Sequence, residues 1–297
     1  TDLFNKSELS IVLINIKTNI NSTNYRSRQT RNKSISHIDE SVELIPHDSN
    51  VYIQDFVITS SYIILEVRKN GLPAISQYQK ESFSVTEITL PDTSYFVSLA
   101  SSDYVDYENN EFHYYYSSPN RPLAIYKANA IKNTSSKVWQ KIVNNFNEDD
   151  YVVERTFNEV RDGTMVPATI VYKADKSLNR PILFYGYGSY GINREASFSE
   201  SILPLINKGF IFVYLNIRGG AEMGKEWYEQ GRMLNKMNSF YDFNDSVEAI
   251  LNKGYGDKNN VFAQGGSAGG LLMGAIVNLK PELYKGIISR VPFVDVL

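Results

Sequence analysis

Short apolar segments rich in β-branched and aromatic residues recur along the first 145 residues, separated by polar turns. Segments of this composition are typical of β-strands. The strand candidates are residues 10–16, 51–58, 62–68, 112–116 and 123–127. Between two of them, Asn70-Gly71 is a strong signal for a two-residue hairpin turn. Repeated short strands without helices predict a sandwich, barrel or propeller, and the polar stretch 18–39 predicts a long loop or an unmatched pair of strands.

From about residue 146 the hydrophobic pattern changes to strands that alternate with helices. The strand candidates are residues 151–156, 167–172, 181–185, 210–217, 261–263 and 286–291, and the helix candidates are 199–207, 239–253 and 271–277. The first two strands flank the turn at 161–163 and predict an antiparallel pair. The later alternation predicts a parallel sheet with helices on both faces, and Asn238 or Ser239 is the expected N-cap of the second helix. We therefore predict two domains, residues 1–145 and 146–297.

The composition is that of an ordinary globular protein, with 42% hydrophobic and 21% charged residues among 297. The net charge of −3 gives no reason to expect a nucleic-acid partner. No apolar run approaches the roughly 20 residues of a membrane span, and no signal peptide is visible, so no membrane partner is expected. The sequence has no cysteine, which excludes disulfides and thiolate catalysis and fits a cytoplasmic location. No metal cluster is visible and no cofactor is implied.

The strongest chemical signal is the string Gly265-Gly266-Ser267-Ala268-Gly269-Gly270, which lies between a strand candidate and a helix candidate. A Gly-x-Ser-x-Gly string in that context predicts the nucleophile elbow of an α/β-hydrolase. Ser267 is then the candidate nucleophile, and the N–H of Ala268 at the helix N-terminus is a candidate oxyanion donor. The alternative interpretation is a glycine-rich turn in which Ser267 only caps the helix.

A serine nucleophile needs a histidine base. In this fold the catalytic triad follows the chain order Ser, Asp or Glu, His. Only 30 residues follow Ser267 (297 − 267), and His37, His47 and His113 all precede it. Asp295 is the one aspartate after the elbow, and we expect it to be structural. We therefore expect the triad Asp and His to lie outside residues 1–297, and this chain alone to have little or no activity.

Two further strings follow strand candidates, where α/β sheets build their sites. Residues 185–191 read Tyr-Gly-Tyr-Gly-Ser-Tyr-Gly, at the place where an α/β-hydrolase keeps the loop with its second oxyanion donor. Residues 216–224 contain Arg218 and Glu222, which form either a buried structural pair or substrate contacts. We favour a structural role for Arg218 and leave the role of Glu222 open.

Together these strings resemble the prolyl oligopeptidase family of serine peptidases, whose pattern runs Tyr-Gly-Tyr-Gly, Arg-Gly-Gly-x-Glu-x-Gly and Gly-Gly-Ser-x-Gly-Gly. Within the family, the residues of these strings are most similar to those of the oligopeptidase B subfamily. The strings that carry this closer resemblance are residues 44–47, 68–72, 185–191, 236–238, 265–274 and 291–296. The resemblance implies an α/β-hydrolase domain, here incomplete because its C-terminal strands are missing, preceded by the last blades of a seven-bladed β-propeller.

The resemblance also implies a role for each matching residue. The implied site consists of the nucleophile Ser267, the oxyanion donors Tyr187 and Ala268 N–H, and the substrate-binding residues Tyr190 and Glu195. Glu195 matches the first of two acidic positions, separated by one residue, that bind basic side chains in the oligopeptidase B subfamily. The second position is Ser197 here, a departure that weakens this basic subsite.

The activity implied by the resemblance is that of a serine oligopeptidase that cleaves short peptides after Arg or Lys through an acyl-enzyme on Ser267. Its partners are then short basic peptides and, for this chain, a separate C-terminal chain. Three alternatives stay open: a split or decayed peptidase fragment, a non-catalytic binding module that uses the β-rich half, and an esterase for small acyl substrates. The oxyanion loop and elbow argue against the binding module, and the family strings favour a peptidase over an esterase.

Overall fold

The computed structural model describes residues 11–13, 42–45, 48, 51–174 and 177–294. The first two of these ranges are β1 (Ile11–Leu13) and β2 (Val42–Ile45), which pair antiparallel. The strand expected at 10–16 is therefore described only in part. The polar stretch 18–39 lies outside the described residues.

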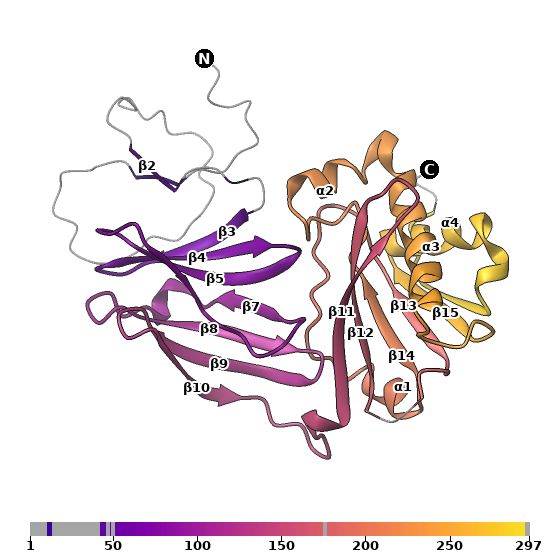
Figure 1. The fold of residues 1–297 in the computed structure, drawn as a ribbon, viewed down its shortest axis with the longest axis horizontal. Helices are drawn as coiled ribbons and strands as arrows, with labels where there is room; N and C mark the ends of the chain where they lie inside the picture. Colours follow the sequence, from indigo (N-terminus) through magenta and orange to yellow (C-terminus); the bar gives the residue numbers. More distant parts are fainter. Residues whose placement is uncertain (1–10, 14–41, 46–47, 49–50, 175–176, 295–297) are drawn as a thin grey trace.

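The first part of the chain forms two antiparallel sheets of four strands each (Figure 1). The first sheet consists of β3 (Val51–Ile58), β4 (Tyr62–Lys69), β5 (Leu72–Gln79) and β6 (Val85–Glu87). The second consists of β7 (Phe96–Leu99), β8 (Glu111–Ser118), β9 (Arg121–Asn129) and β10 (Thr134–Gln140). Both follow the chain as simple meanders. The hairpin predicted at Asn70-Gly71 is confirmed, because both residues have positive φ, 51° and 76°, as a primed two-residue turn requires.

The two meanders pack against each other through alternating apolar side chains. In β8 every second residue up to Tyr116 is buried, which is the period of two that a strand imposes. The shared core includes Ile64 and Ile75 from the first sheet and Val97 and Phe112 from the second. Four-stranded antiparallel sheets stacked in this way are the blades of a propeller.

The second part of the chain is built on a six-stranded sheet in the order β11-β12-β14-β13-β15-β16. Its strands are β11 (Tyr151–Glu159), β12 (Met165–Lys173), β13 (Ile182–Tyr185), β14 (Ile211–Leu215), β15 (Val261–Gly266) and β16 (Gly286–Arg290). The first two strands form the predicted antiparallel pair, and β12 also runs antiparallel to β14. The neighbours among β13, β14, β15 and β16 are all parallel, as expected from the alternation of strands and helices.

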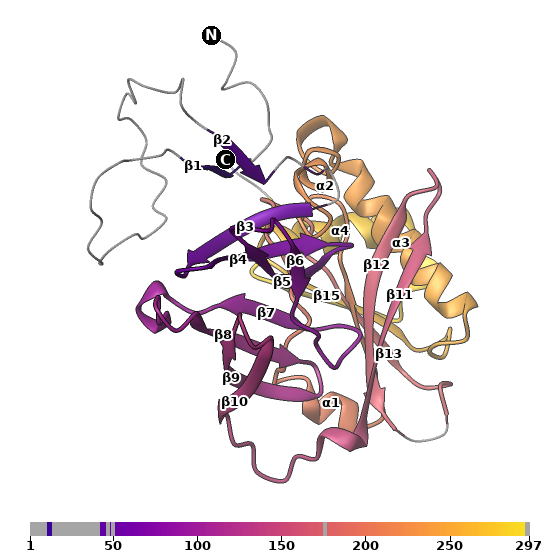
Figure 2. The same ribbon diagram turned by 60° about the vertical axis from the view of Figure 1, so that its left-hand side comes forward.

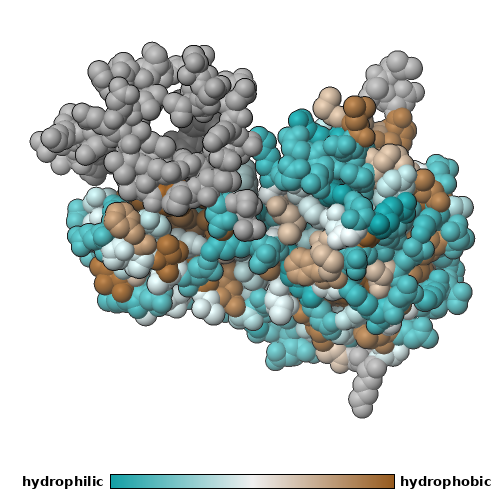
Figure 3. All heavy atoms as spheres, turned by 45° about the horizontal axis from the view of Figure 1, so that its top comes forward, coloured by the Kyte–Doolittle hydropathy of each residue, from teal (hydrophilic) through white to brown (hydrophobic). Residues whose placement is uncertain are grey.

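Helices cover both faces of this sheet. They are α1 (Leu203–Asn207), α2 (Lys225–Glu229), α3 (Met237–Asn252) and α4 (Ala268–Leu279). Short 3-10 turns lie at Ser102–Tyr104, Glu148–Asp150, Met233–Asn235 and Pro281–Leu283. Phe184 packs in the core that α3 and α4 share, whereas its neighbour Leu183 packs with Ile206 of α1 on the opposite face. On the side shown in Figure 3, hydrophilic side chains predominate between smaller hydrophobic areas. No helix in the described part of the chain is long and apolar enough to cross a membrane.

Two helix predictions need correction. The helix expected over 199–207 comprises only α1, which begins at Leu203. The expected cap of α3 is wrong, because the helix begins at Met237 and its N-cap position is Lys236. Asn238 instead donates its side-chain N–H to the carbonyl of Gln230 (2.9 Å).

The two parts of the chain meet along β11 and β12, which lie between the propeller sheets and the rest of the hydrolase sheet in Figure 1. Arg155 of β11 donates to the carbonyl of Asn70 (2.9 Å), at the tip of the β4–β5 hairpin. The hydroxyls of Ser94 and Thr169 are hydrogen-bonded at 2.5 Å. These polar contacts fix the first part of the chain against the sheet that carries the elbow.

Candidate active site

Ser267 sits at the sharp turn between β15 and α4, with φ 55° and ψ −119°. A positive φ is uncommon for a residue with a side chain and costs free energy. Backbone hydrogen bonds hold the turn: the N–H of Ser267 donates to the carbonyl of Arg290 (3.0 Å), and its own carbonyl accepts from Phe293 N–H (3.0 Å). The Ser267 hydroxyl makes no capping hydrogen bond to α4, and the residue is exposed. Ser267 thus occupies the N-cap position of α4 without capping it through its side chain, which argues against the interpretation as a plain helix cap.

The glycines around Ser267 are required by close packing rather than by flexibility. A Cβ atom on Gly265 would overlap the carbonyl of Gly269 in the first turn of α4. A Cβ on Gly270 would lie 2.5 Å from the Cα of Pro292. Real Cβ atoms do not approach backbone this closely, so any larger residue would push α4 away from the sheet.

The backbone N–H of Ala268 lies at the N-terminus of α4. The first N–H groups of a helix have no acceptor within it, and the helix dipole adds partial positive charge there. An oxyanion formed at a substrate carbonyl attacked by Ser267 would meet this N–H, which is the geometry expected for an oxyanion donor.

Tyr187 comes to the same place from the loop after β13. We call residues 186–192 the Tyr-Gly loop. The ring of Tyr187 is buried, and a Cβ on Gly269 would lie 3.3 Å from its Cδ2, so the ring packs on the first turn of α4. The guanidinium of Arg194 covers the ring at 4.4 Å from its centroid. The structure thus brings together Tyr187, Ala268 and Ser267, the three residues predicted to perform the chemistry.

Tyr190 occupies the tip of the Tyr-Gly loop. Tyr190 and Gly191 have φ values of 59° and 63°, and the N–H of Ile192 donates to the carbonyl of Ser189 (3.1 Å), so the tip is a tight turn. The Tyr190 side chain is 63% exposed, and it is carried by the same loop as Tyr187. The exposed ring is free of the core, and the role of Tyr190 in substrate binding stays a prediction.

Glu195 is engaged in an ion pair across the two parts of the chain. Its carboxylate pairs with the guanidinium of Arg68 from β4, whose side chain is only 1% exposed. Burial lowers the pKa of Arg68, while the nearby Glu222 raises it. The sequence suggested Glu195 as a contact for basic substrates but gave no sign of this partner. A basic substrate group would have to share Glu195 with Arg68.

Arg218 and Glu222 do not pair with each other. Arg218 forms a two-pronged ion pair with Asp242 of α3 (Nε to Oδ2 2.9 Å, Nη2 to Oδ1 2.5 Å) and a further one with Asp162 (2.7 Å). The structural role that we favoured for Arg218 agrees with this buried pairing. Asp242 was missed by the sequence reasoning, although an acidic residue between Phe240 and Phe243 of an apolar helix face signals a buried partner.

Glu222 is buried beside the Tyr-Gly loop. It accepts the backbone N–H of Arg194 (2.9 Å) and the side-chain N–H of Asn216 (3.2 Å). Burial raises its pKa. These contacts fix the segment that follows the loop, so Glu222 supports the position of Arg194 over the Tyr187 ring.

Among the described residues the only histidine is His113, and it belongs to the propeller part. Its Nδ1 lies 2.9 Å from the carbonyl of Tyr104. Figures 1 and 2 both show its strand, β8, far from α4. His37, His47 and Asp295 lie outside the described residues.

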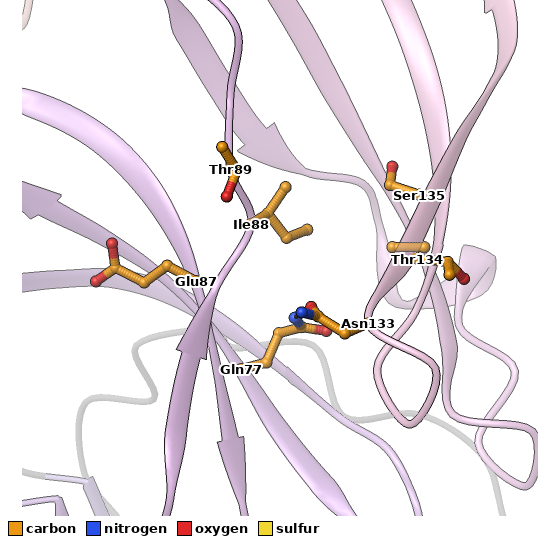
Figure 4. Close-up of a pocket in the computed structure, with 8 residues that line it drawn as sticks. Gln77, Glu87, Ile88, Thr89, Asn133, Thr134 and Ser135 are labelled. Atoms are coloured by element: carbon orange, nitrogen blue, oxygen red, sulfur yellow. Dashed lines mark hydrogen bonds between the residues drawn. The ribbon is translucent and has the colours of Figure 1, made fainter.

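A small pocket opens between the two propeller sheets, well separated from the elbow (Figure 4). Its lining is mostly polar and neutral, and it includes Gln77, Asn133 and Thr134. Gln77 donates to the side-chain oxygen of Asn133 (3.0 Å), so the pocket wall is held together by its own hydrogen bonds.

Comparison with known proteins decides the family. The prolyl oligopeptidase family matches residues 196–297, and its N-terminal β-propeller domain matches residues 13–141. The chain belongs to the prolyl oligopeptidase family. The family consists of serine peptidases, and the predicted fold class is confirmed: propeller-domain strands followed by part of an α/β-hydrolase.

Relatives within the family align along most of this chain. It is 33% identical to dipeptidyl aminopeptidase BI of Pseudoxanthomonas mexicana, over 95% of this chain and 39% of that protein. It is 32% identical to protease 2 of Moraxella lacunata, over 89% of this chain and 38% of that protein. The structure of oligopeptidase B from Leishmania major superposes with a TM-score of 0.78 and 33% identity, over 86% of this chain and 37% of that one. The chain therefore spans less than two fifths of the length of these relatives.

Proposed function

We propose that this chain carries the nucleophile of a serine oligopeptidase. Ser267 Oγ attacks the carbonyl carbon of the scissile peptide bond and passes its proton, through a base, to the leaving amine. The N–H of Ala268 and the hydroxyl of Tyr187 stabilise the oxyanion. Water then cleaves the acyl-enzyme ester and restores the hydroxyl. The observation that carries this proposal is the strained, exposed Ser267 at the turn from β15 to α4, because this is the conformation and place of the serine in a nucleophile elbow.

The base has to come from a histidine that reaches Ser267. In the described part of the chain, His113 is held in the propeller part by its contact with Tyr104. We therefore propose that residues 1–297 alone turn over peptides very slowly, and that a C-terminal segment of the family completes the site. Without a base, only binding and the oxyanion donors contribute to the rate.

We propose a preference for short peptides with Arg or Lys before the cleaved bond. This preference rests on the family resemblance, in which the carboxylates that recognise that residue follow the elbow, whereas Glu195, with its side chain 22% exposed, would belong to the subsite for a second basic residue. The pairing with Arg68 and the neutral Ser197 both weaken the subsite for a second basic residue. The related proteins are named dipeptidyl aminopeptidase, protease 2 and prolyl endopeptidase, so peptide hydrolysis is what their names share.

A fluorophosphonate probe tests the nucleophile directly. We expect Ser267 to be labelled when a C-terminal segment of the family is added, and much less without it. Ser267→Ala should abolish labelling, whereas Ser136→Ala, at an exposed serine of β10, should leave it intact. The proposal would be contradicted by labelling of the Ser267→Ala chain. It would also be contradicted if the unsubstituted chain were not labelled with or without the C-terminal segment. Cleavage of matched amide and ester substrates then separates a peptidase from an esterase.

A further inference from the structure

Lys236 reaches from the start of α3 back to the Tyr-Gly loop. Its ammonium donates to the carbonyl of Gly188, to the hydroxyl of Ser189 (2.9 Å) and to the hydroxyl of Ser239 (3.2 Å). An ammonium has three N–H donors, and three oxygens accept them here. Two of those oxygens belong to consecutive residues of the loop, directly after Tyr187.

The carbonyl of Gly188 is the point where three segments of the chain converge. A Cβ on Gly219 would overlap this oxygen, so the turn after β14 presses against it. A Cβ on Gly188 itself would lie 2.7 Å from the side chain of Ile217. The hydroxyl of Ser239 donates to the carbonyl of Arg218 (2.6 Å) and so joins the turn to α3. Lys236 closes this junction by binding the loop from the side of α3.

Lys236 is partly buried and is bound by hydrogen bonds rather than by an ion pair. Among the described residues no carboxylate forms an ion pair with it, and all three of its acceptors are neutral oxygens. Burial lowers its pKa to about 8. A partly desolvated charge without a counter-ion destabilises the fold, and the three hydrogen bonds of Lys236 to the loop and to α3 offset part of this cost.

We propose that Lys236 is a positioning residue for the oxyanion hole. By holding the carbonyl of Gly188 it fixes the backbone of the Tyr-Gly loop and thereby keeps the Tyr187 ring on the first turn of α4. The catalytic consequence rests on the function proposed above, whereas the restraint on the loop is a property of this chain alone. The two parts are therefore tested by separate measurements.

Hydrogen exchange followed by mass spectrometry tests the restraint without any need for activity. Lys236→Met keeps most of the side-chain length and removes the donors. We expect exchange in peptides that cover residues 186–192 to become at least about tenfold faster, as loss of charge-assisted hydrogen bonds predicts. Peptides from the propeller sheets should not change. Lys236→Arg should restore much of the protection, and Lys208→Met, at an exposed lysine after α1, is the matched control.

Turnover tests the catalytic consequence in the chain completed with a C-terminal segment. We expect Lys236→Met to lower kcat by about tenfold or more with little change in KM, because the loss falls on oxyanion stabilisation. Lys236→Arg should recover part of kcat. If the unsubstituted chain is never labelled at Ser267, the proposed function fails while the exchange result still decides the role of Lys236.

Two outcomes would overturn the proposal. One is loop exchange in Lys236→Met equal to that of the unsubstituted chain. The other is faster exchange that Lys236→Arg does not reverse. If Lys236→Met speeds exchange throughout the hydrolase part, Lys236→Gln decides, because its side chain keeps a neutral N–H donor. We then expect faster exchange in residues 186–192 alone, and unchanged exchange there would overturn the proposal.

Discussion

Ser267 and its neighbours combine strain with close packing. The serine adopts a φ of 55°, a conformation that costs an L-residue roughly 1–3 kcal/mol. The strain persists because β16 and the first turn of α4 hold the backbone on both sides through Arg290 and Gly270. Glycines at 265 and 270 let α4 come close enough for these hydrogen bonds to form. The nucleophile is thus positioned by the packing of its backbone.

This packing predicts opposite effects for two glycines of the same region. Gly265→Ala should destabilise the chain by more than about 2 kcal/mol, since its Cβ would overlap the Gly269 carbonyl. Gly274→Ala should stabilise it by roughly 0.5–1 kcal/mol, because Gly274 lies within α4 with open space around its Cα. Urea unfolding measures both. Equal effects of the two substitutions would show that the elbow is not packed as described.

Lys236 predicts a pH dependence of stability. Its folded-state pKa is about 8, below the ordinary lysine value of 10.5. Between these two values the unfolded chain binds more protons than the folded chain, so the free energy of unfolding rises with pH across this window. Relative to Lys236→Met, the unsubstituted chain should gain roughly 2–3 kcal/mol from pH 8 to pH 10.5 and nothing below pH 8. Urea unfolding of both proteins across this range is the measurement; a constant difference would contradict the buried ammonium.

Among single residues, the sequence predicted those site residues that are recognised by their neighbours along the chain. Ser267 and Ala268 belong to one string, and Tyr187 follows a buried strand, so local patterns sufficed. The partners of Arg68 and Arg218 were beyond reach. Arg68 meets Glu195, and Arg218 meets Asp242, only because the sheet brings distant segments together.

Among the elements, the strands were predicted more closely than the helices. The strand β3 was predicted with its observed bounds, because it is rich in β-branched and aromatic residues and ends at a turn. The helix expected from residue 199 begins only at Leu203, and Pro204 accounts for this: proline fits the first turn of a helix but has no N–H to bond back to the carbonyl of residue 200. Helix α3 begins two residues earlier than expected, at Met237, with Lys236 at its N-cap position and no side-chain capping hydrogen bond.

The buried ion pair that joins α3 to the turn after β14 gives an element-level prediction. Asp242 is fully buried, whereas Asp162 is 42% exposed, and both pair with Arg218. Asp242→Asn should destabilise the chain by roughly 3–5 kcal/mol, because it leaves a buried guanidinium without its main partner. Asp162→Asn should cost less than about 1 kcal/mol. If urea unfolding showed that both substitutions lower the free energy of unfolding equally, the buried pair with Asp242 would be no more stabilising than the exposed pair with Asp162.

At the scale of the whole molecule, the all-β propeller part and the α/β hydrolase part share one interface. The alternation of strands with helices predicted a parallel sheet covered by helices, and the absence of helices predicted an all-β first part, which only the family resemblance identified as a propeller. The way in which they dock was not predictable, since it depends on single polar contacts such as that of Arg155 with the Asn70 carbonyl. The interface also places Arg68, a propeller residue, on the carboxylate of Glu195.

A double-mutant cycle on Arg68 and Glu195 tests that docking. Arg68 is 1% exposed, so Glu195→Gln should cost roughly 3–5 kcal/mol by leaving a buried charge with a weaker partner. Arg68→Met combined with Glu195→Gln should cost less than the sum of the two single substitutions, since either one alone already breaks the pair. Glu229→Gln, in the more exposed pair with Arg232, is the control and should cost less than about 1 kcal/mol. Additive losses in the cycle would show that the two parts of the chain dock without help from this ion pair, and that Glu195 is free to bind a basic substrate.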